Sequence, residues 1–296
     1  MRCASAGARS PFTSLHNKPG GGEPTHARAL LGARDLRPKK HLGQHFLMDG
    51  GAAARIARLC EGLPLVVEIG AGTGALTAQL AKLEARVVAI EIDPDLVAIL
   101  REREDLRGVE IVDGDALAVD YGALAPSGAW CAAGNLPYNV ATPLILLWLG
   151  LPNPPERIVA MVQKDVAERF TAKPATPAYG SLTLAVQYAM QVERAFALGP
   201  EVFYPRPRVD SAVVVMRRRA TPSVETRDRA FMLQVVRAAF AYRRKTLANS
   251  LALALGIPRE RTQAALTTLG RDTEIRGEHF DLGAFAQLAD ALVQRT

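Results

Sequence analysis

Short runs of β-branched residues alternate with helical patterns through much of this 296-residue chain, and this alternation limits its fold more than any other feature. Strands that alternate with helices favour a mainly parallel, doubly wound α/β sheet of the Rossmann-like type. The expected strands are residues 65–69, 87–90, 109–112, 130–133 and 158–162, and the expected helices are 75–83, 95–103 and 140–149. Sheets of this kind bind ligands beyond the carboxyl ends of their strands, so we look for the chemistry there.

The regions on either side of this alternation have different patterns. After the Pro-rich residues 200–207 comes a last expected strand, 211–216, and beyond Pro222 the pattern is helical to the end. The expected helices there are 227–242, 245–255, 259–269 and 282–294. Residues 1–37 mix Gly, Pro, Ala, Ser and Arg without apolar periodicity, which predicts a disordered tail. We therefore divide the chain into a tail (1–37), a main domain (38–220) and a small C-terminal α-helical domain (221–296).

Positive charge is concentrated in two parts of the chain. The formal net charge is +6, but residues 1–40 alone hold eight Lys or Arg against two acids. Residues 201–250 contain eleven Lys or Arg against four acids, which suits contact with a polyanion such as a nucleic acid. A solvated basic face is the alternative that charge alone leaves open.

The composition also argues against several classes of protein. No apolar run reaches the roughly 18 residues needed to cross a bilayer, so we expect no membrane span. Cys3, Cys60 and Cys131 form no close pair, so neither a disulfide framework nor a zinc site is expected. We expect a cytoplasmic protein. A mitochondrial transit peptide in the Arg-bearing tail is the alternative, although the tail lacks an amphipathic pattern.

A glycine-rich motif lies at residues 68–75, between the first expected strand and the first expected helix. Glycines at such a turn let the backbone bend tightly and approach a ligand closely. The motif is ambiguous by itself, because Gly70, Gly72 and Ala75 also satisfy the pattern of dinucleotide-binding proteins.

Acidic residues end the first three expected strands: Glu68, Glu91 and Asp115. A carboxylate at Glu91 can accept hydrogen bonds from both hydroxyls of a ribose, and Asp115 can accept one from an adenine amine. Together the three acids predict an adenosine pocket, which suits NAD and S-adenosylmethionine equally. Asp93 and Pro94 are expected to begin the next helix, as its N-cap and its first residue.

The fourth expected strand runs into Asn135-Leu136-Pro137-Tyr138. An adenine amine is a poor nucleophile because its lone pair is delocalised into the ring. Acceptors that hold its hydrogens would turn that lone pair toward a methyl donor, and the Asn135 side chain and the Leu136 carbonyl can supply them. Pro137 fixes the turn, and Tyr138 can stack on an unstacked adenine. In isolation the same four residues also fit an Asn-Pro turn beside a buried tyrosine.

Taken together, these segments resemble the ribosomal RNA adenine dimethyltransferase family. The resemblance covers roughly residues 38–294. It rests on residues 39–47, the glycine motif, Glu91, Asp115 and residues 135–138, 202–214 and 243–251. It implies a class I methyltransferase fold, a helical domain that docks RNA, S-adenosylmethionine as methyl donor, and no metal.

The resemblance also implies roles for particular residues. His45 and Leu47 would border the methionine end of the cofactor, and His45 stands where many relatives carry Asn. The remaining implied cofactor residues are Glu68, Gly70, Gly72, Glu91, Asp115 and Asn135.

Other implied residues would contact the RNA. Phe203 is similar to a family aromatic that packs on the target base opposite Tyr138, with a core aromatic as the rival interpretation. The expected RNA-binding residues are Arg206, Arg208, Arg243, Arg244 and Lys245. The last three are expected to open a helix, where an external phosphate would offset their unfavourable position relative to the helix dipole.

The resulting hypothesis is a monomeric enzyme that dimethylates adjacent adenines in a hairpin loop of small-subunit ribosomal RNA, in two successive transfers to each amine. Three other functions stay open. They are a ribosome-assembly factor with secondary catalysis, a large-subunit methyltransferase of the macrolide-resistance type, and an NAD-dependent reductase. The segment 243–251 favours the small-subunit branch of the family.

Overall fold

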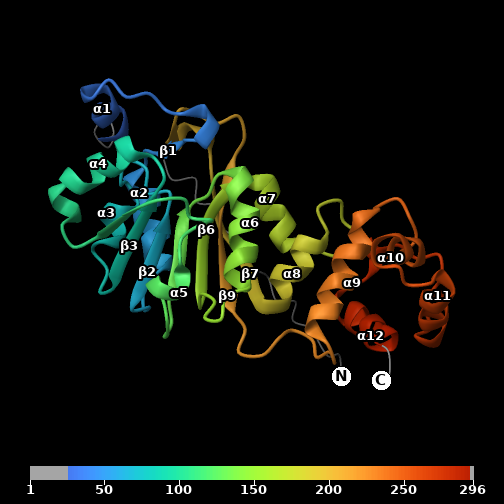
Figure 1. Ribbon diagram of the computed structural model, residues 1–296. Coiled ribbons are helices and arrows are strands. Elements are labelled where there is room, and N and C mark those ends of the chain that lie inside the picture. The colour runs from blue at the N-terminus through green and yellow to red at the C-terminus, as the bar shows by residue number, and fades with distance from the viewer. Residues whose placement is uncertain (1–25, 294–296) are drawn as a thin grey trace, which may run out of the picture.

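A seven-stranded sheet forms the centre of the protein in the computed structural model, which describes residues 26–293 (Figure 1). The strands lie in the order β4-β3-β2-β5-β6-β9-β7. The first five run parallel to one another, β9 is antiparallel to β6, and β7 is antiparallel to β9. The bounds are β2 Leu65–Ile69, β3 Arg86–Glu91, β4 Glu110–Asp113, β5 Cys131–Asn135, β6 Arg157–Gln163, β7 Met190–Leu198 and β9 Ser211–Arg218. The expected mainly parallel α/β sheet is confirmed.

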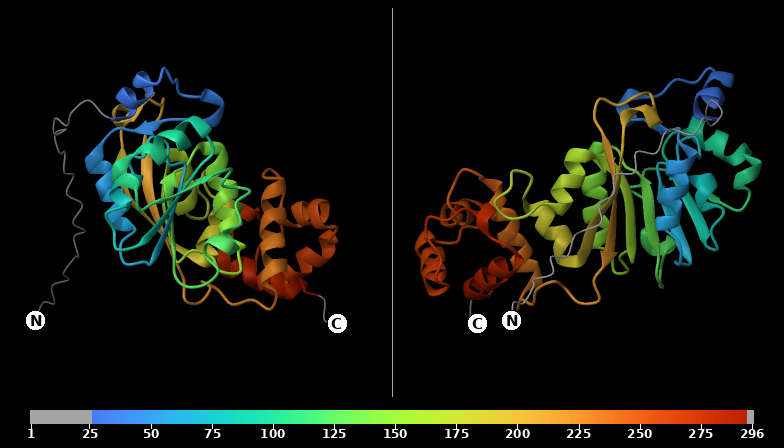
Figure 2. Two further views of the ribbon diagram at one scale, coloured as in Figure 1. Left: turned by 60° about the vertical axis from the view of Figure 1, so that its left-hand side comes forward. Right: turned by 180° about the vertical axis from the view of Figure 1, so that it is seen from behind.

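Helices cover both faces of this sheet (Figures 1 and 2). The helices on one face are α2 (Gly50–Leu59), α3 (Thr77–Leu80) and α4 (Pro94–Glu102); those on the other are α5 (Tyr121–Leu124), α6 (Tyr138–Leu149), α7 (Lys164–Thr171) and α8 (Ser181–Ala189). Successive strand residues point to opposite faces, so a strand covered on both sides is apolar throughout. In β6, residues 158–162 are all buried for this reason.

Four helices form a separate group at the carboxyl end, beside α8 (Figures 1 and 2). Their bounds are α9 Arg229–Ala241, α10 Leu247–Leu255, α11 Arg259–Thr268 and α12 Leu282–Leu292. The buried Phe285 and Leu266 lie in their core, which also includes Leu184 and Tyr188 of α8. The four expected helices are therefore present, and the division of the chain near residue 220 stays a prediction. No helix among residues 26–293 is both long and apolar enough to cross a membrane.

Several elements differ from the sequence-based expectations. Residues 26–33 of the expected tail form helix α1 (His26–Ala33), so the prediction of disorder is wrong there; residues 1–25 lie outside the described part of the chain. Strand β7 was not expected because most of its residues are not buried, and it lacks a continuous apolar run. The helix expected at 75–83 is a single turn, Thr77–Leu80, because the glycine turn before it extends to residue 76.

A second, small sheet joins the amino-terminal region to a distant part of the chain. Its two strands are β1 (Phe46–Leu47) and β8 (Phe203–Tyr204), which pair antiparallel. Phe46 lies opposite Tyr204, and Leu47 lies opposite Phe203. Two-residue strands give no periodic signal, and neither strand was expected from the sequence.

Strands β2 and β5 pack closely at Gly134, just before the turn that follows β5. A Cβ added to Gly134 in β5 would overlap the carbonyl oxygen of Ile69 in β2, and backbone atoms cannot move aside as a side chain can. We expect Gly134→Ala to lower the free energy of unfolding by about 1–3 kcal/mol, measured by urea denaturation. Gly108→Ala is the control, because a Cβ there meets open space, and equal losses in the two variants would contradict the packing argument.

Candidate active site

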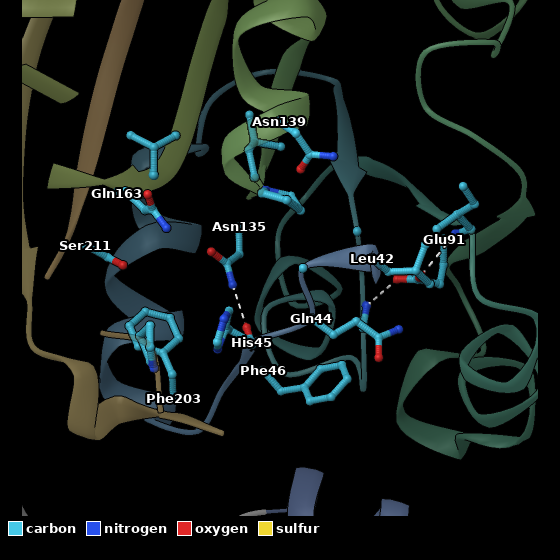
Figure 3. A pocket seen from close by; sticks show the side chains of 18 of the residues that line it. Leu42, Gln44, His45, Phe46, Glu91, Asn135, Asn139, Gln163, Phe203 and Ser211 are labelled. Atoms are coloured by element: carbon cyan, nitrogen blue, oxygen red, sulfur yellow. Dashed lines mark hydrogen bonds between the residues drawn. The ribbon is translucent and has the colours of Figure 1, made fainter. Parts of the chain in front are cut away.

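A cavity of about 230 Å³ lies beyond the carboxyl ends of β2, β3, β5 and β6 (Figure 3). The parallel strands bring these ends to one edge of the sheet, as expected for ligand sites in such folds. The lining residues come from the segment before β1, the glycine turn, the end of β3, the turn after β5 and the segment around β8. They include Gln44, His45, Phe46, Gly70, Gly72, Glu91, Ile92, Leu96, Asn135, Leu136, Pro137, Asn139, Gln163, Phe203 and Ser211.

Asn135 is held at the centre of this cavity by a hydrogen bond (Figure 3). Its Nδ2 donates to the backbone carbonyl of His45 at 2.8 Å, which fixes the plane of the amide. Its Oδ1 receives no hydrogen bond from the described residues and is available to a ligand. The next residue, Leu136, donates its backbone N–H to the carbonyl of Met161 at 2.9 Å, which holds the turn on β6.

Pro137 and Tyr138 complete the turn. Pro137 is the N-cap of α6, and Tyr138 is the first residue of that helix. The side chain of Tyr138 lies outside the described part of the structure, so base stacking by Tyr138 stays a prediction.

His45 connects the turn after β5 to the segment that follows β8. Its ring Nδ1 donates to the carbonyl of Pro205 at 2.6 Å, while its own carbonyl accepts from Asn135. Beyond it, the N–H of Met48 donates to the carbonyl of Val202 at 2.7 Å, on the far side of the β1–β8 pair. These bonds place Phe203, which is 5% exposed, in the cavity wall on the same side as Asn135 and His45.

Asp93 fastens the same amino-terminal segment to the other side of the cavity. Its carboxylate accepts from Gln44 Nε2 at 2.7 Å and from Lys39 Nζ at 2.6 Å, and Lys39 also reaches Asp95 at 2.8 Å. Burial alone would raise the pKa of Asp93, but the hydrogen bonds from Lys39 and Gln44 outweigh it and hold that pKa below its usual value. Asp93 is also the N-cap of α4, with Pro94 at its first turn, as expected.

Glu91 presents a buried carboxylate at the end of β3. One oxygen accepts from the N–H of Gly72 at 2.7 Å, and the other accepts from the N–H groups of Ile92 and Asp93 at 3.0 Å. Burial raises the pKa of Glu91, and these backbone bonds act against the rise. Gly72 has a φ of 61°, and a Cβ there would lie 3.1 Å from the Phe46 ring, so the turn needs glycine at this position.

Three expected cofactor residues do not line the cavity that the described residues form. Leu47 is buried in the core with residues of α2. Asp115 is exposed, and its Oδ1 accepts from the N–H of Leu117 at 2.9 Å within its own loop. Glu68 is 1% exposed and lies inside the protein. Their contact with a cofactor stays a prediction.

Several cavity residues were missed by the sequence reasoning. Gln163 ends β6 and faces Ser211, the first residue of β9, across the ladder. Gln163 is the last residue of an apolar strand, as Glu91 is. Polar residues at the carboxyl ends of all the parallel strands, and not of the first four alone, are therefore candidates for the site. Ile92 is an apolar side chain left 46% exposed beside Glu91, and Asn139 lies in the first turn of α6.

The expected RNA-binding residues form two exposed groups. Arg206 and Arg208 lie in the segment after β8. Arg243, Arg244 and Lys245 lie in the turn between α9 and α10, before the N-cap Thr246, so the expectation that they open a helix is wrong. The turn is outside α10 because the Thr246 side chain accepts the N–H of Asn249 and begins the helix there.

The side chain of Arg243 is held by backbone carbonyls of another segment. Its guanidinium donates to the carbonyls of Pro177 (3.1 Å) and Tyr179 (3.3 Å). The turn lies at the same end of the molecule as β1 and the amino end of α6 (Figures 1 and 2). Contact of this turn with phosphates stays a prediction.

Glu68 is a buried acid whose ionisation couples stability to pH. Burial is the largest cause of its raised pKa, about 7, and the neighbouring carboxylate of Glu91 adds to the rise. One of its carboxyl oxygens and the hydroxyl of Thr77 are both buried without a hydrogen bond of standard geometry in the described residues. Both observations favour a protonated Glu68 below neutral pH.

A pH series should reveal this proton. The folded protein binds this proton more tightly than the unfolded chain does. The stabilisation from protonated Glu68 should therefore be fully present below about pH 4.5 and should be lost as the pH rises through 7. Between pH 5 and 8 we expect the free energy of unfolding of the wild-type protein to fall by about 2–3 kcal/mol relative to Glu68→Gln, measured by denaturant unfolding. Glu84→Gln, at an exposed position, controls for the loss of one carboxylate, and parallel curves for wild type and Glu68→Gln would refute the assignment.

Comparison with known proteins agrees with this geometry. A family model for ribosomal RNA adenine dimethylase matches residues 36–290. The chain is 42% identical to ribosomal RNA small subunit methyltransferase A of Pelotomaculum thermopropionicum, over 91% of this chain and 96% of that protein. The protein of the same name from Streptococcus gordonii is 41% identical, over 90% and 95% of the two chains.

Solved structures share the fold. A dimethyladenosine transferase from Plasmodium falciparum superposes with a TM-score of 0.68 at 24% identity, over 82% of this chain and 95% of that one. The 23S rRNA methyltransferase ErmE superposes with a TM-score of 0.64 at 27% identity, over 84% and 100%. The expected class I methyltransferase fold is confirmed, and the chain belongs to the ribosomal RNA adenine dimethylase family.

Proposed function

We propose that this protein transfers two methyl groups from S-adenosylmethionine to the exocyclic amine of each of two adjacent adenines in a hairpin loop of small-subunit ribosomal RNA. The observation that carries the proposal is Asn135, whose amide is fixed by the carbonyl of His45 while its oxygen faces the cavity. The 42% identical relative is named as a small-subunit methyltransferase, which favours this branch over NAD-dependent reduction.

The turn after β5 supplies acceptors for the target amine. Asn135 Oδ1 and the carbonyl of Leu136 are not used by the described residues, and together they can hold both amine hydrogens. The nitrogen lone pair then points away from the ring plane. After the first transfer one hydrogen remains, so one acceptor is enough to hold the amine for the second.

The cavity residues fit the cofactor that the family implies. Glu91 Oε1 already accepts from Ile92 and Asp93, while Oε2 accepts only from Gly72 and keeps one lone pair for a ribose hydroxyl. The exposed Ile92 offers an apolar surface for the adenine ring, and Asp115 would accept from its amine. When bound, S-adenosylmethionine supplies a methyl group that its sulfonium makes electrophilic, so alignment matters more than a strong base.

The target base would be held between aromatic side chains. Phe203 is buried in the cavity wall near Asn135, which supports contact with the base but also gives Phe203 a packing role with α2 and β9. We assign the opposite face of the base to Tyr138. Arg206, Arg208, Arg244 and Lys245 would contact phosphates, which orients the RNA without reading its bases.

The remaining assignments belong to the same proposal. The protein would act as a cytoplasmic monomer that needs no metal. A role mainly in ribosome assembly is the alternative, and so is a large-subunit methyltransferase of the resistance type, to which ErmE is 27% identical.

The decisive experiment follows methyl transfer to unmethylated small ribosomal subunits by mass spectrometry of RNA fragments. We expect dimethyladenosine in a small-subunit loop with the wild-type protein. Asn135→Ala should lower the rate by about 100-fold or more, because one fixed electrostatic contact in the transition state is lost. An unchanged melting temperature would confirm that the variant folds.

Other outcomes would select the alternatives. Transfer to large-subunit RNA alone would support the resistance-type enzyme. An Asn135→Ala variant that restores subunit assembly in cells without methylating would support the assembly factor. A wild-type rate in Asn135→Ala would contradict the role given to the amide.

The basic turn makes a separate prediction about RNA affinity. Replacing both Arg244 and Lys245 with Ala should weaken binding to small-subunit RNA and lower its salt slope by about two, since two phosphate contacts are lost. Arg243→Ala should instead lower the melting temperature, because its guanidinium bonds to two backbone carbonyls. Filter binding at several salt concentrations measures the first effect, and an unchanged slope would remove the turn from the interface.

A further inference from the structure

Helix α1 lies beside α4 (Figure 1) and packs in one apolar cluster with residues of α4 and β1. Its Ala27 and Leu31 are each 3% exposed and are buried in one apolar cluster with Phe46, Leu96 and Ile99. Phe46 and Leu96 also line the cavity. These two side chains thus belong both to the cluster that includes α1 and to the apolar part of the cavity lining.

Two further contacts attach α1 to this region. The guanidinium of Arg28 lies over the Tyr204 ring, 5.2 Å from its centre, and Tyr204 pairs with Phe46 across the β1–β8 ladder. Arg34, just after the helix, forms an ion pair with Glu102 of α4. The ion pair is exposed and contributes little by itself, so the buried apolar contacts carry most of the attachment.

The wall needs this support because its own elements are short. Strand β1 has two residues and a single two-residue partner, which cannot fix an aromatic ring by backbone pairing alone. On its inner side Phe46 already lies close to Gly72 of the glycine turn. Ala27 and Leu31 of α1 share one cluster with Phe46, so loss of α1 would remove part of the apolar packing that holds the ring.

We infer that α1 is a positioning element for the methyl-donor site: by packing behind Phe46 and Leu96 it holds the apolar wall in the shape that binds S-adenosylmethionine. The inference rests on the proposed function. An eight-residue helix is not stable alone, so α1 forms only while it is packed on this wall. Binding of the cofactor and docking of α1 are therefore linked, and each strengthens the other.

The test compares full-length variants by calorimetric titration with S-adenosylhomocysteine, which binds without reacting. Leu31→Asp places a charge in the buried contact and should raise the Kd by more than about three-fold. Ala29→Asp adds the same charge on the exposed side of the same helix and should leave the Kd within that limit. Leu31→Met keeps the buried volume and should behave like wild type.

Steady-state kinetics separates an effect on cofactor binding, which changes KM, from a loss of folded enzyme, which lowers the apparent kcat. In Leu31→Asp the KM for S-adenosylmethionine should rise while kcat at saturation stays close to wild type. Hydrogen exchange on the wild-type protein provides a test that needs no variant: saturating S-adenosylhomocysteine should slow exchange of the amides of α1.

The outcomes distinguish this inference from the function on which it rests. If wild-type protein does not bind S-adenosylhomocysteine, the proposed function fails. If the wild type binds but Leu31→Asp changes the Kd by less than about three-fold, or α1 exchange is unaffected by ligand, the inference fails and the function stands.

Discussion

The hydrogen bond from Asn135 to the carbonyl of His45 joins two parts of the chain that must act together. One partner ends a central strand, and the other belongs to a segment that packs outside the sheet. Because the donor nitrogen is used in this contact, the side-chain oxygen is left facing the cavity. The same segment places Gln44 beside Asp93 and Phe46 beside Gly72. The hydrogen bond to Asn135 therefore helps to fix the position of this whole segment relative to the turn after β5.

The acceptor groups of the cavity are fixed by the fold. Glu91 receives three backbone N–H groups, and the Asn135 Oδ1 and the Leu136 carbonyl have no hydrogen-bond donor among the described residues. Such fixed groups need no rearrangement when a reaction begins, which is how a protein gains most from electrostatic stabilisation. The buried Glu68 lies behind them and is kept neutral more readily than an exposed acid would be.

Much of the fold and the centre of the site could be predicted from sequence because the signals are local. Glu91 and Asn135 are the last residues of buried strands and the glycine turn directly follows one, and the parallel sheet brings those ends together without further information. What could not be predicted depends on pairing between distant residues: His45 and Pro205 are 160 residues apart, and β1 and β8 are too short to show a period. Helix α1 was missed for the same reason, since Phe46, Leu96 and Ile99 make it a buried element.

Strand β9 and helix α9 run in opposite directions, and this has a consequence for where the turn after α9 lies. It begins at Ser211 beside the cavity and ends at Arg218 at the opposite edge of the sheet, a path of about 26 Å. Helix α9 then runs back over about 20 Å, toward the end of the molecule at which β9 begins. Two segments that are far apart in the sequence, the turn after β5 and the turn between α9 and α10, therefore lie at the same end of the molecule. Under the proposed function, an RNA bound at this end has both turns on the same side of the protein.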